Sequence, residues 1–223
     1  MKKNLYVILF VIVGVVVVAP LQAASGRVAV TPKASTLGLG ADVSFKVAPL
    51  VNLRVSGQQF DYERSDTLDD IPYDIELGLQ SFGAAVDVHP FNGSFHLSAG
   101  LLANGNEVSS EAKLVPTDTY EIGGTLYTGA QLGGVNGSVD FDSTAPYLGV
   151  GWGNPFAKER RLGFSFGLGV IRQGVPDISL NVDNAALVPG LEQEIAQEEA
   201  NLEQEFENFE YFPVVSVGLS IRL

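Results

Sequence analysis

The chain has 223 residues, 25 glycines, no cysteine and a formal charge of −13 at pH 7. Without cysteine, it can form neither a disulfide scaffold nor a lipoprotein anchor on an N-terminal cysteine. The acidic balance argues against nucleic acid as a partner, because binding to phosphates needs a cationic surface.

The first 24 residues have the pattern of a secretory signal peptide. Two lysines precede an apolar run at residues 5–19, and small residues follow at Ala23 and Ala24. The run is short for a membrane-spanning helix, which needs roughly 20 residues. We therefore expect cleavage near Ala23 or Ala24, leaving residues 25–223 as one secreted domain; an uncleaved inner-membrane anchor is the alternative.

Eight later segments alternate apolar residues with polar or small ones, the period expected of β-strands. They lie near residues 27–33, 37–47, 51–56, 75–88, 95–101, 139–152, 162–170 and 215–223. We expect the first strand to end at Pro32, and a shift of the alternation near Ser81 to mark a β-bulge. Short connections alternate with long ones, the long ones being 63–74, 105–134 and 174–210.

One face of these strands is aliphatic or aromatic, whereas the other carries glycine, serine, asparagine and charged residues. A soluble lipocalin-like barrel or a sandwich would instead bury its apolar face inside. The pattern predicts an all-β protein, an eight-stranded antiparallel transmembrane β-barrel of the outer membrane, with short turns and both termini in the periplasm. Aromatic residues at strand ends are expected to form interfacial girdles: Phe60, Tyr62, Tyr73, Tyr147, Trp152, Phe156, Tyr211 and Phe212.

The last nine residues alternate up to the C-terminus and predict the strand that closes the barrel. Its apolar face consists of Val215, Val217, Leu219, Ile221 and Leu223. We expect the barrel-insertion machinery to recognise residues 215–223.

On the segments 89–91, 145–154, 164–170 and 211–223, the chain resembles small eight-stranded outer-membrane proteins related to the OmpA transmembrane domain, OmpW and the opacity proteins. It is more closely similar to a largely uncharacterised proteobacterial outer-membrane family. It departs at Leu223, where such barrels usually end in phenylalanine. The resemblance implies a monomeric, non-enzymatic envelope protein, surrounded by outer-membrane lipid and lipopolysaccharide, that acts structurally or through its outer loops. A narrow OmpW-like pore for small or apolar solutes is the alternative.

The polar strand faces place a set of ionisable side chains inside the expected barrel. Eight strands leave a lumen that side chains can fill, and buried charges must be paired, so we expect these groups to neutralise one another. If water remained between them, the same ring would act as an ion filter. The set consists of Asp42, Lys46, Arg54, Glu76, Asp87, His96 and Arg222.

A catalytic alternative rests on His96 and Ser98, two residues apart on one strand face, with Glu107 further along. Such a set could form an acyl hydrolase acting on lipid A. The alternation directs His96 and Ser98 into the lumen, out of reach of a lipid substrate. We therefore assign no catalytic residue, and the sequence shows no spacing typical of a cofactor or metal site.

Residues 191–210 predict an amphipathic helix in the fourth outer loop, with apolar residues from Leu191 to Phe209 at helical spacing. We expect its apolar stripe to pack on other loops and its glutamates to be solvated. The alternatives are a lid, a partner-binding helix, or carboxylates that share Ca²⁺ or Mg²⁺ with lipopolysaccharide phosphates. In the third outer loop, Gly123 and Gly124 predict a hairpin tip. The carboxylates of the helix are Glu192, Glu194, Glu198, Glu199, Glu203, Glu205, Glu207 and Glu210.

Overall fold

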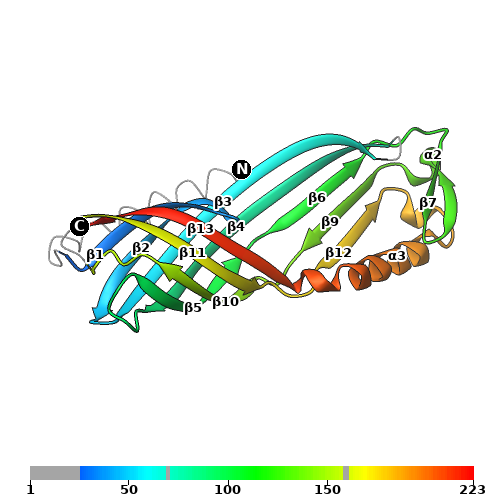
Figure 1. Ribbon diagram of the computed structural model, residues 1–223. Coiled ribbons are helices and arrows are strands. Elements are labelled where there is room, and N and C mark those ends of the chain that lie inside the picture. Colours follow the sequence, from blue (N-terminus) through cyan, green and yellow to red (C-terminus); the bar gives the residue numbers. More distant parts are fainter. Residues whose placement is uncertain (1–25, 69–70, 158–160) are drawn as a thin grey trace.

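The computed structural model describes residues 26–68, 71–157 and 161–223, and the expected signal peptide lies outside these residues. Eight strands form a closed antiparallel barrel, which confirms the predicted fold (Figure 1). The ring closes where the first strand pairs with the last. In ring order the strands are β1 (Val28–Ser35), β2 (Gly38–Ala48), β3 (Val51–Leu68), β4 (Ile71–Val88), β5 (Phe95–Asn104), β10 (Thr144–Trp152), β11 (Leu162–Arg172) and β13 (Tyr211–Arg222).

The outside of the barrel carries a belt of exposed aliphatic and aromatic side chains. Such a surface is unfavourable in water and suits the hydrocarbon region of a bilayer. None of the helices in the described part of the chain is long and apolar enough to cross a membrane. The belt includes Leu39, Leu53, Phe82, Val86, Leu97, Leu101, Leu148, Trp152, Leu162, Phe164, Leu168, Val217, Leu219 and Ile221.

The two described ends of the chain meet at one end of the barrel, here named the near rim. The Gly26 N–H donates to the Leu223 carbonyl at 2.7 Å. The turns between β2 and β3, β4 and β5, and β10 and β11 lie at this rim. The opposite end is the far rim.

Pro32 does not end the first strand. β1 continues to Ser35, which pairs with Gly38 of β2. Proline cannot donate a backbone hydrogen bond to the ladder, and here the Thr31 hydroxyl donates to Ser220 Oγ of β13 at 3.1 Å. The prediction of a strand break at Pro32 was therefore wrong.

Beyond the far rim, half of the barrel is continued by a five-stranded antiparallel sheet, here named the wall (Figure 1). In sheet order, the wall consists of the parts of β3 and β4 that extend beyond the far rim, followed by β6 (Glu107–Ala112), β9 (Val135–Asp140) and β12 (Asp177–Val182). The expected long loop at 63–74 is therefore mostly strand.

The predicted β-bulge near Ser81 is absent from the described β3–β4 pairs, whose register runs unbroken from Val51–Val88 to Leu68–Ile71. The apolar residues change face for another reason. Phe82 points outward within the belt, whereas Leu79 shares the inward face with Ser81. Where the strand leaves the belt, its outward face meets water, so the apolar residues move to the inner side.

A compact cap lies against the far end of the wall. Its hairpin pairs β7 (Thr119–Ile122) with β8 (Thr125–Thr128), and Gly123 and Gly124 form the tip with φ of 60° and 85°, as predicted. The short helix α2 (Gly129–Leu132) follows. The predicted helix of the fourth far-rim connection is α3 (Leu191–Glu205), bounded by 3₁₀ turns at Ala185–Leu187 and Glu207–Glu210. A shared core joins these parts: Tyr127, Leu132, Val182, Leu191 and Ile195.

Candidate functional site

A network of charged side chains lies in the part of the lumen toward the near rim, beside a hollow of about 60 Å³. Arg54 donates from Nε and Nη2 to the two oxygens of Asp87, both at 2.9 Å, and its Nη1 lies 3.7 Å from Asp42. Lys33 Nζ lies 2.7 Å from Asp42 Oδ1, and the Ser98 hydroxyl donates to Asp87 Oδ1 at 2.6 Å. We name these five residues the lumen network.

The strand register explains why these groups meet. Arg54 pairs with Ser44 of β2 and Ala85 of β4, so Asp42 and Asp87, each two residues further along, are its diagonal neighbours on the inward face. Two cations face two carboxylates, which makes the network electrically neutral. All four charged side chains are largely buried, and their pairing offsets the cost of removing them from water.

An apolar layer lies inside the ring toward the far rim. Leu37 is 1% exposed and Ile171 is 0% exposed, although both lie inside the ring. Leu102 stands four residues beyond Ser98 on β5, about 13 Å along the strand. Apolar side chains therefore occupy the lumen on the far-rim side of the lumen network. The layer consists of Leu37, Leu102, Ala145, Ile171 and Val214, with Tyr147 and Phe212 packed against it.

Four of the seven expected lumen residues fall outside the network. Lys46, opposite Asn52, and Arg222, opposite Ala29, are half-buried toward the near rim. His96 is half-buried opposite Gly151.

Glu76 requires a correction, because it lies outside the lumen on the exposed, outward face of the wall. It pairs with Glu63 of β3 and Ser109 of β6, well beyond the far rim. Its apparent position inside the barrel followed from the supposed phase shift near Ser81.

Three residues of the interior were missed or misplaced from the sequence: Lys33, Tyr147 and Phe212, the last of which was expected in an aromatic girdle but pairs with Ile171 and packs against the apolar layer. Lys33 was lost because β1 was expected to end at Pro32; the alternation of Thr31, Lys33 and Ser35 was the signal that could have found it. Tyr147 was assigned to an aromatic girdle, yet it lies inside, with its ring centroid 5.9 Å from the Arg54 guanidinium carbon. Its position in the alternation, on the opposite strand face from the exposed Leu148, was the signal that could have placed it inside.

His89 anchors the near-rim turn that follows β4. Its side chain is buried, Nε2 lies 2.9 Å from Asn52 Nδ2, and Nδ1 lies 3.2 Å from the Phe95 carbonyl. With the Asn52 amide donating, the ring is neutral with its proton on Nδ1. Burial lowers the pKa of His89, and the neighbouring His96, whose ring centroid lies 5.0 Å away, lowers this pKa further.

The residues of the hydrolase hypothesis are not brought together. The Ser98 hydroxyl donates to Asp87 and accepts from Arg54 Nη2 at 3.3 Å, whereas His96 Nδ1 lies 3.4 Å from the Ser94 carbonyl. Glu107 begins β6 in the wall and is exposed. Ser98 therefore belongs to the lumen network.

Helix α3 covers the free edge of β12. Glu199 accepts the Leu180 N–H at 2.7 Å, and Glu203 accepts the Ile178 N–H at 3.4 Å. These two carboxylates supply acceptors for two N–H groups at the edge of the last strand of the wall.

The remaining carboxylates of the acidic segment vary in their surroundings. Glu210 pairs with Arg172. Across 26–68, 71–157 and 161–223, no three histidine, aspartate or glutamate side chains gather closely enough to hold a metal ion. Glu192, Glu205 and Glu207 are exposed, and Glu194 and Glu198 are half-buried.

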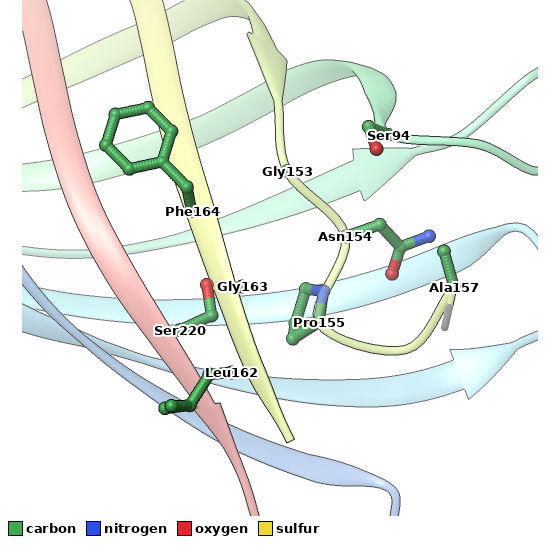
Figure 2. Close-up of a pocket in the computed structure, with 9 residues that line it drawn as sticks. All are labelled: Ser94, Gly153, Asn154, Pro155, Ala157, Leu162, Gly163, Phe164 and Ser220. Carbon is green, nitrogen blue, oxygen red and sulfur yellow. The ribbon is translucent and has the colours of Figure 1, made fainter. Parts of the chain in front are cut away.

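A hollow of about 230 Å³ lies at the near rim between the turn after β10 and the start of β11 (Figure 2). Its described lining has no ionisable side chain. Asn154 is committed to the turn, donating to the Gly93 carbonyl at 3.3 Å and accepting the Phe156 N–H at 3.0 Å. The Ser220 hydroxyl bonds Thr31. This hollow therefore offers little to a ligand.

No family model matches the chain, and no curated protein matches it. The crystal structures of CarO2 and CarO from Acinetobacter baumannii are similar, with TM-scores of 0.58 and 0.55. Both are 20% identical to this chain, and each alignment covers 88% of it and 98% of the other protein. A major outer membrane protein from Thermus thermophilus aligns with a TM-score of 0.41 and 14% identity over 88% of this chain and 99% of its own. The two Acinetobacter proteins share the barrel fold of this chain.

Proposed function

We propose that the protein is a non-enzymatic, non-conducting barrel of the outer membrane that acts through the wall. In this proposal the near rim and both termini face the periplasm, after the signal peptide has been removed. The wall then stands outside the cell, among the lipopolysaccharide. The short near-rim turns support this orientation, since short turns are periplasmic in bacterial outer-membrane barrels.

The observation that carries the proposal is the apolar layer. A conducting lumen needs a polar, hydrated lining, whereas Leu37 and Ile171 are inaccessible to water inside the ring. Below them, every charge of the lumen network has a partner of opposite sign. This arrangement favours a filled barrel over the OmpW-like pore.

The remaining parts of the proposal concern assembly. The closing strand β13 has its apolar residues, from Val215 to Ile221, exposed on the outside of the barrel. This face supports recognition of residues 215–223 by the barrel-insertion machinery, and a closed ring is consistent with a monomer.

Planar-bilayer recordings on the refolded protein test the closed lumen. We expect no steady conductance from the wild type, and measurable conductance from a variant that combines Leu37→Gly with Ile171→Gly, because this variant removes the two largest fully buried side chains of the apolar layer. Steady, salt-dependent current through the wild type would overturn the proposal.

The absence of cysteine makes single-cysteine labelling a clean test of orientation. Thr117→Cys lies in the exposed cap, and Phe91→Cys lies in an exposed near-rim turn. On intact cells, a membrane-impermeant maleimide is expected to label the first variant and to label the second only after the outer membrane is opened. The reverse pattern would contradict the orientation.

A further inference from the structure

The outward face of the wall carries two parallel rows of polar side chains that cross five strands. Between the rows lies a hollow of about 830 Å³, here named the wall groove. The row nearer the barrel contains Glu63, Glu76, Ser109, Ser138 and Ser179. The row farther from it contains Ser65, Asp74, Glu111, Asn136 and Asn181.

The half of the groove formed by β6, β9 and β12 has unused hydrogen-bonding capacity. At the other end of the groove, by contrast, the Asp74 carboxylate already binds Ser65 and Lys113, both at 2.6 Å. Neighbouring strands lie about 4.8 Å apart, so the free groups follow one another at a regular spacing. Within the described chain, no hydrogen bond is formed by the side chains of Ser109, Ser138, Ser179, Asn136 and Asn181.

The charge around the groove excludes anionic ligands and favours groups that donate hydrogen bonds. The cations among the described residues that line the groove are Arg64 and Lys113, and each is engaged by an aspartate, Arg64 by Asp66 and Lys113 by Asp74. Carboxylate and amide oxygens accept from hydroxyl groups, and serine hydroxyls both donate and accept. A neutral, hydroxyl-rich chain satisfies these requirements. The carboxylates flanking the groove on the side of the barrel are Asp61, Glu107, Asp140 and Asp177.

The position of the groove indicates where such a chain would come from. The groove opens on the same strand face as the lipid-facing belt, since Glu76 and Phe82 both point outward from β4. These two residues are six positions apart, about 20 Å along the strand. A ligand on this face therefore stands beside the barrel in the same leaflet, above the acyl chains.

We propose that the wall groove binds an uncharged stretch of the sugar chain of neighbouring lipopolysaccharide. The proposal rests on the proposed outward placement of the wall. No aromatic side chain is among the described residues that line the groove, so recognition depends on hydrogen bonds rather than on ring stacking. Individual contacts are then weak, and confinement of both molecules to one leaflet raises their effective concentration.

The test measures binding of neutral O-chain polysaccharide, released from lipid A by mild acid, to the full mature protein in detergent micelles. We expect the double variant Asn136→Ala/Asn181→Ala to bind at least about fivefold more weakly, which is about 1 kcal/mol. Ser138→Trp, which fills the groove, is expected to abolish binding. Gln80→Ala removes an exposed polar side chain from the same face outside the groove and should change nothing. The retained gel-mobility shift of the unboiled protein shows that each variant is folded.

Equal binding by the wild type and Ser138→Trp, or no binding by the wild type, would overturn the proposal. The proposal would also be overturned if the wild type bound lipid A that carries no O-chain and Ser138→Trp abolished that binding, because the groove would then recognise the lipid. Salt-sensitive binding of polylysine in place of the polysaccharide would assign the groove to cationic polypeptides instead. Intact lipopolysaccharide in the same micelle is expected to bind more tightly than the released chain.

This test is independent of the cellular location of the protein. Failure of cysteine labelling together with groove-dependent sugar binding would refute only the proposed orientation. Surface labelling of the wall together with absent sugar binding would refute only the ligand.

Discussion

Arg54 and Asp87 face each other across the β3–β4 pair inside the barrel and share two hydrogen bonds of 2.9 Å each. The planar guanidinium fits both carboxylate oxygens at once, a geometry that lysine cannot reproduce. The apolar layer shields this pair on the side of the far rim, and only a small hollow of about 60 Å³ adjoins it toward the near rim. Removal of one therefore leaves an uncompensated charge in a medium of low polarity.

Arg54→Ala is accordingly expected to lower the free energy of unfolding by about 3–5 kcal/mol, the cost typical of breaking a buried pair. The measurement is urea-induced unfolding in lipid vesicles, followed by tryptophan fluorescence; Trp152 is the one tryptophan of the chain.

Arg64→Ala is the matched control. Arg64 also pairs with an aspartate, Asp66 at 2.7 Å, but its side chain is 59% exposed. Its loss should cost within about 0.5 kcal/mol, because exposed ion pairs contribute little. Similar destabilisation by the two variants would show that water reaches the lumen network.

The fold was largely predictable because period two identifies the strands and the faces of their residues. The unbroken register through Ser81 shows the limit of this rule. Alternation reveals which residues share a face, but not which medium that face meets. β4 passes from lipid into water, its apolar residues change sides, and Glu76 was consequently placed in the lumen instead of on the wall.

The interior was less predictable than the strands. Asp42, Arg54 and Asp87 could be found from their phase alone, since all three lie in long, regular strands. Lys33 and Tyr147 were missed although their phase was readable: Lys33 follows Pro32, which was expected to end the strand, and Tyr147, which follows Pro146, was assigned to an aromatic girdle. Tertiary pairing on both sides keeps these prolines in the ring, so their local propensity does not decide the outcome.

The lowered pKa of His89 predicts that the stability of the folded protein falls in mild acid. Its pKa in the folded protein is lower than the ordinary value of 6.5, because burial disfavours the charged ring. The unfolded chain regains the ordinary pKa and takes up the proton first. The stability that the neutral His89 ring contributes is therefore complete above pH 6.5. It is lost as the pH falls from 6.5 toward the lower pKa of His89 in the folded protein.

Comparison with His89→Gln isolates this effect. Between pH 7.5 and 5, the urea midpoint of the wild type should fall further than that of the variant, since all other titrating groups are common to both proteins. Parallel curves would show that His89 is protonated to the same extent in the folded and unfolded states.

Glu199 is expected to hold the edge of the wall. Glu199→Ala leaves the Leu180 N–H without its acceptor, at a cost of about 1–2 kcal/mol. Hydrogen exchange of the Leu180 amide should accelerate by about tenfold, while amides of β1 are unchanged. Glu205→Ala removes an exposed glutamate from the same helix and should leave the exchange rate unaltered. Unchanged exchange in Glu199→Ala would mean that solvent satisfies this donor equally well.

The close approach of β2 and β3 makes Gly40 the most sensitive glycine of the lumen face. A Cβ at Gly40 would lie 1.9 Å from the Gly57 carbonyl oxygen and 2.7 Å from Gln58 Cα, and these backbone atoms are fixed by the ladder. Gly40→Ala must therefore push the two strands apart, and we expect destabilisation of about 3 kcal/mol or more.

Gly163→Ala provides the matched control, since the nearest atom to its added Cβ, Ser220 Cβ, is 3.9 Å away. We expect this variant to refold with the yield and urea midpoint of the wild type, whereas Gly40→Ala should lose most of the gel-mobility shift that marks a folded barrel. A normal shift for Gly40→Ala would require the β2–β3 pair to open without loss of ring closure. That result would contradict the tight contact between Gly40 and the Gly57 carbonyl that the strand register imposes.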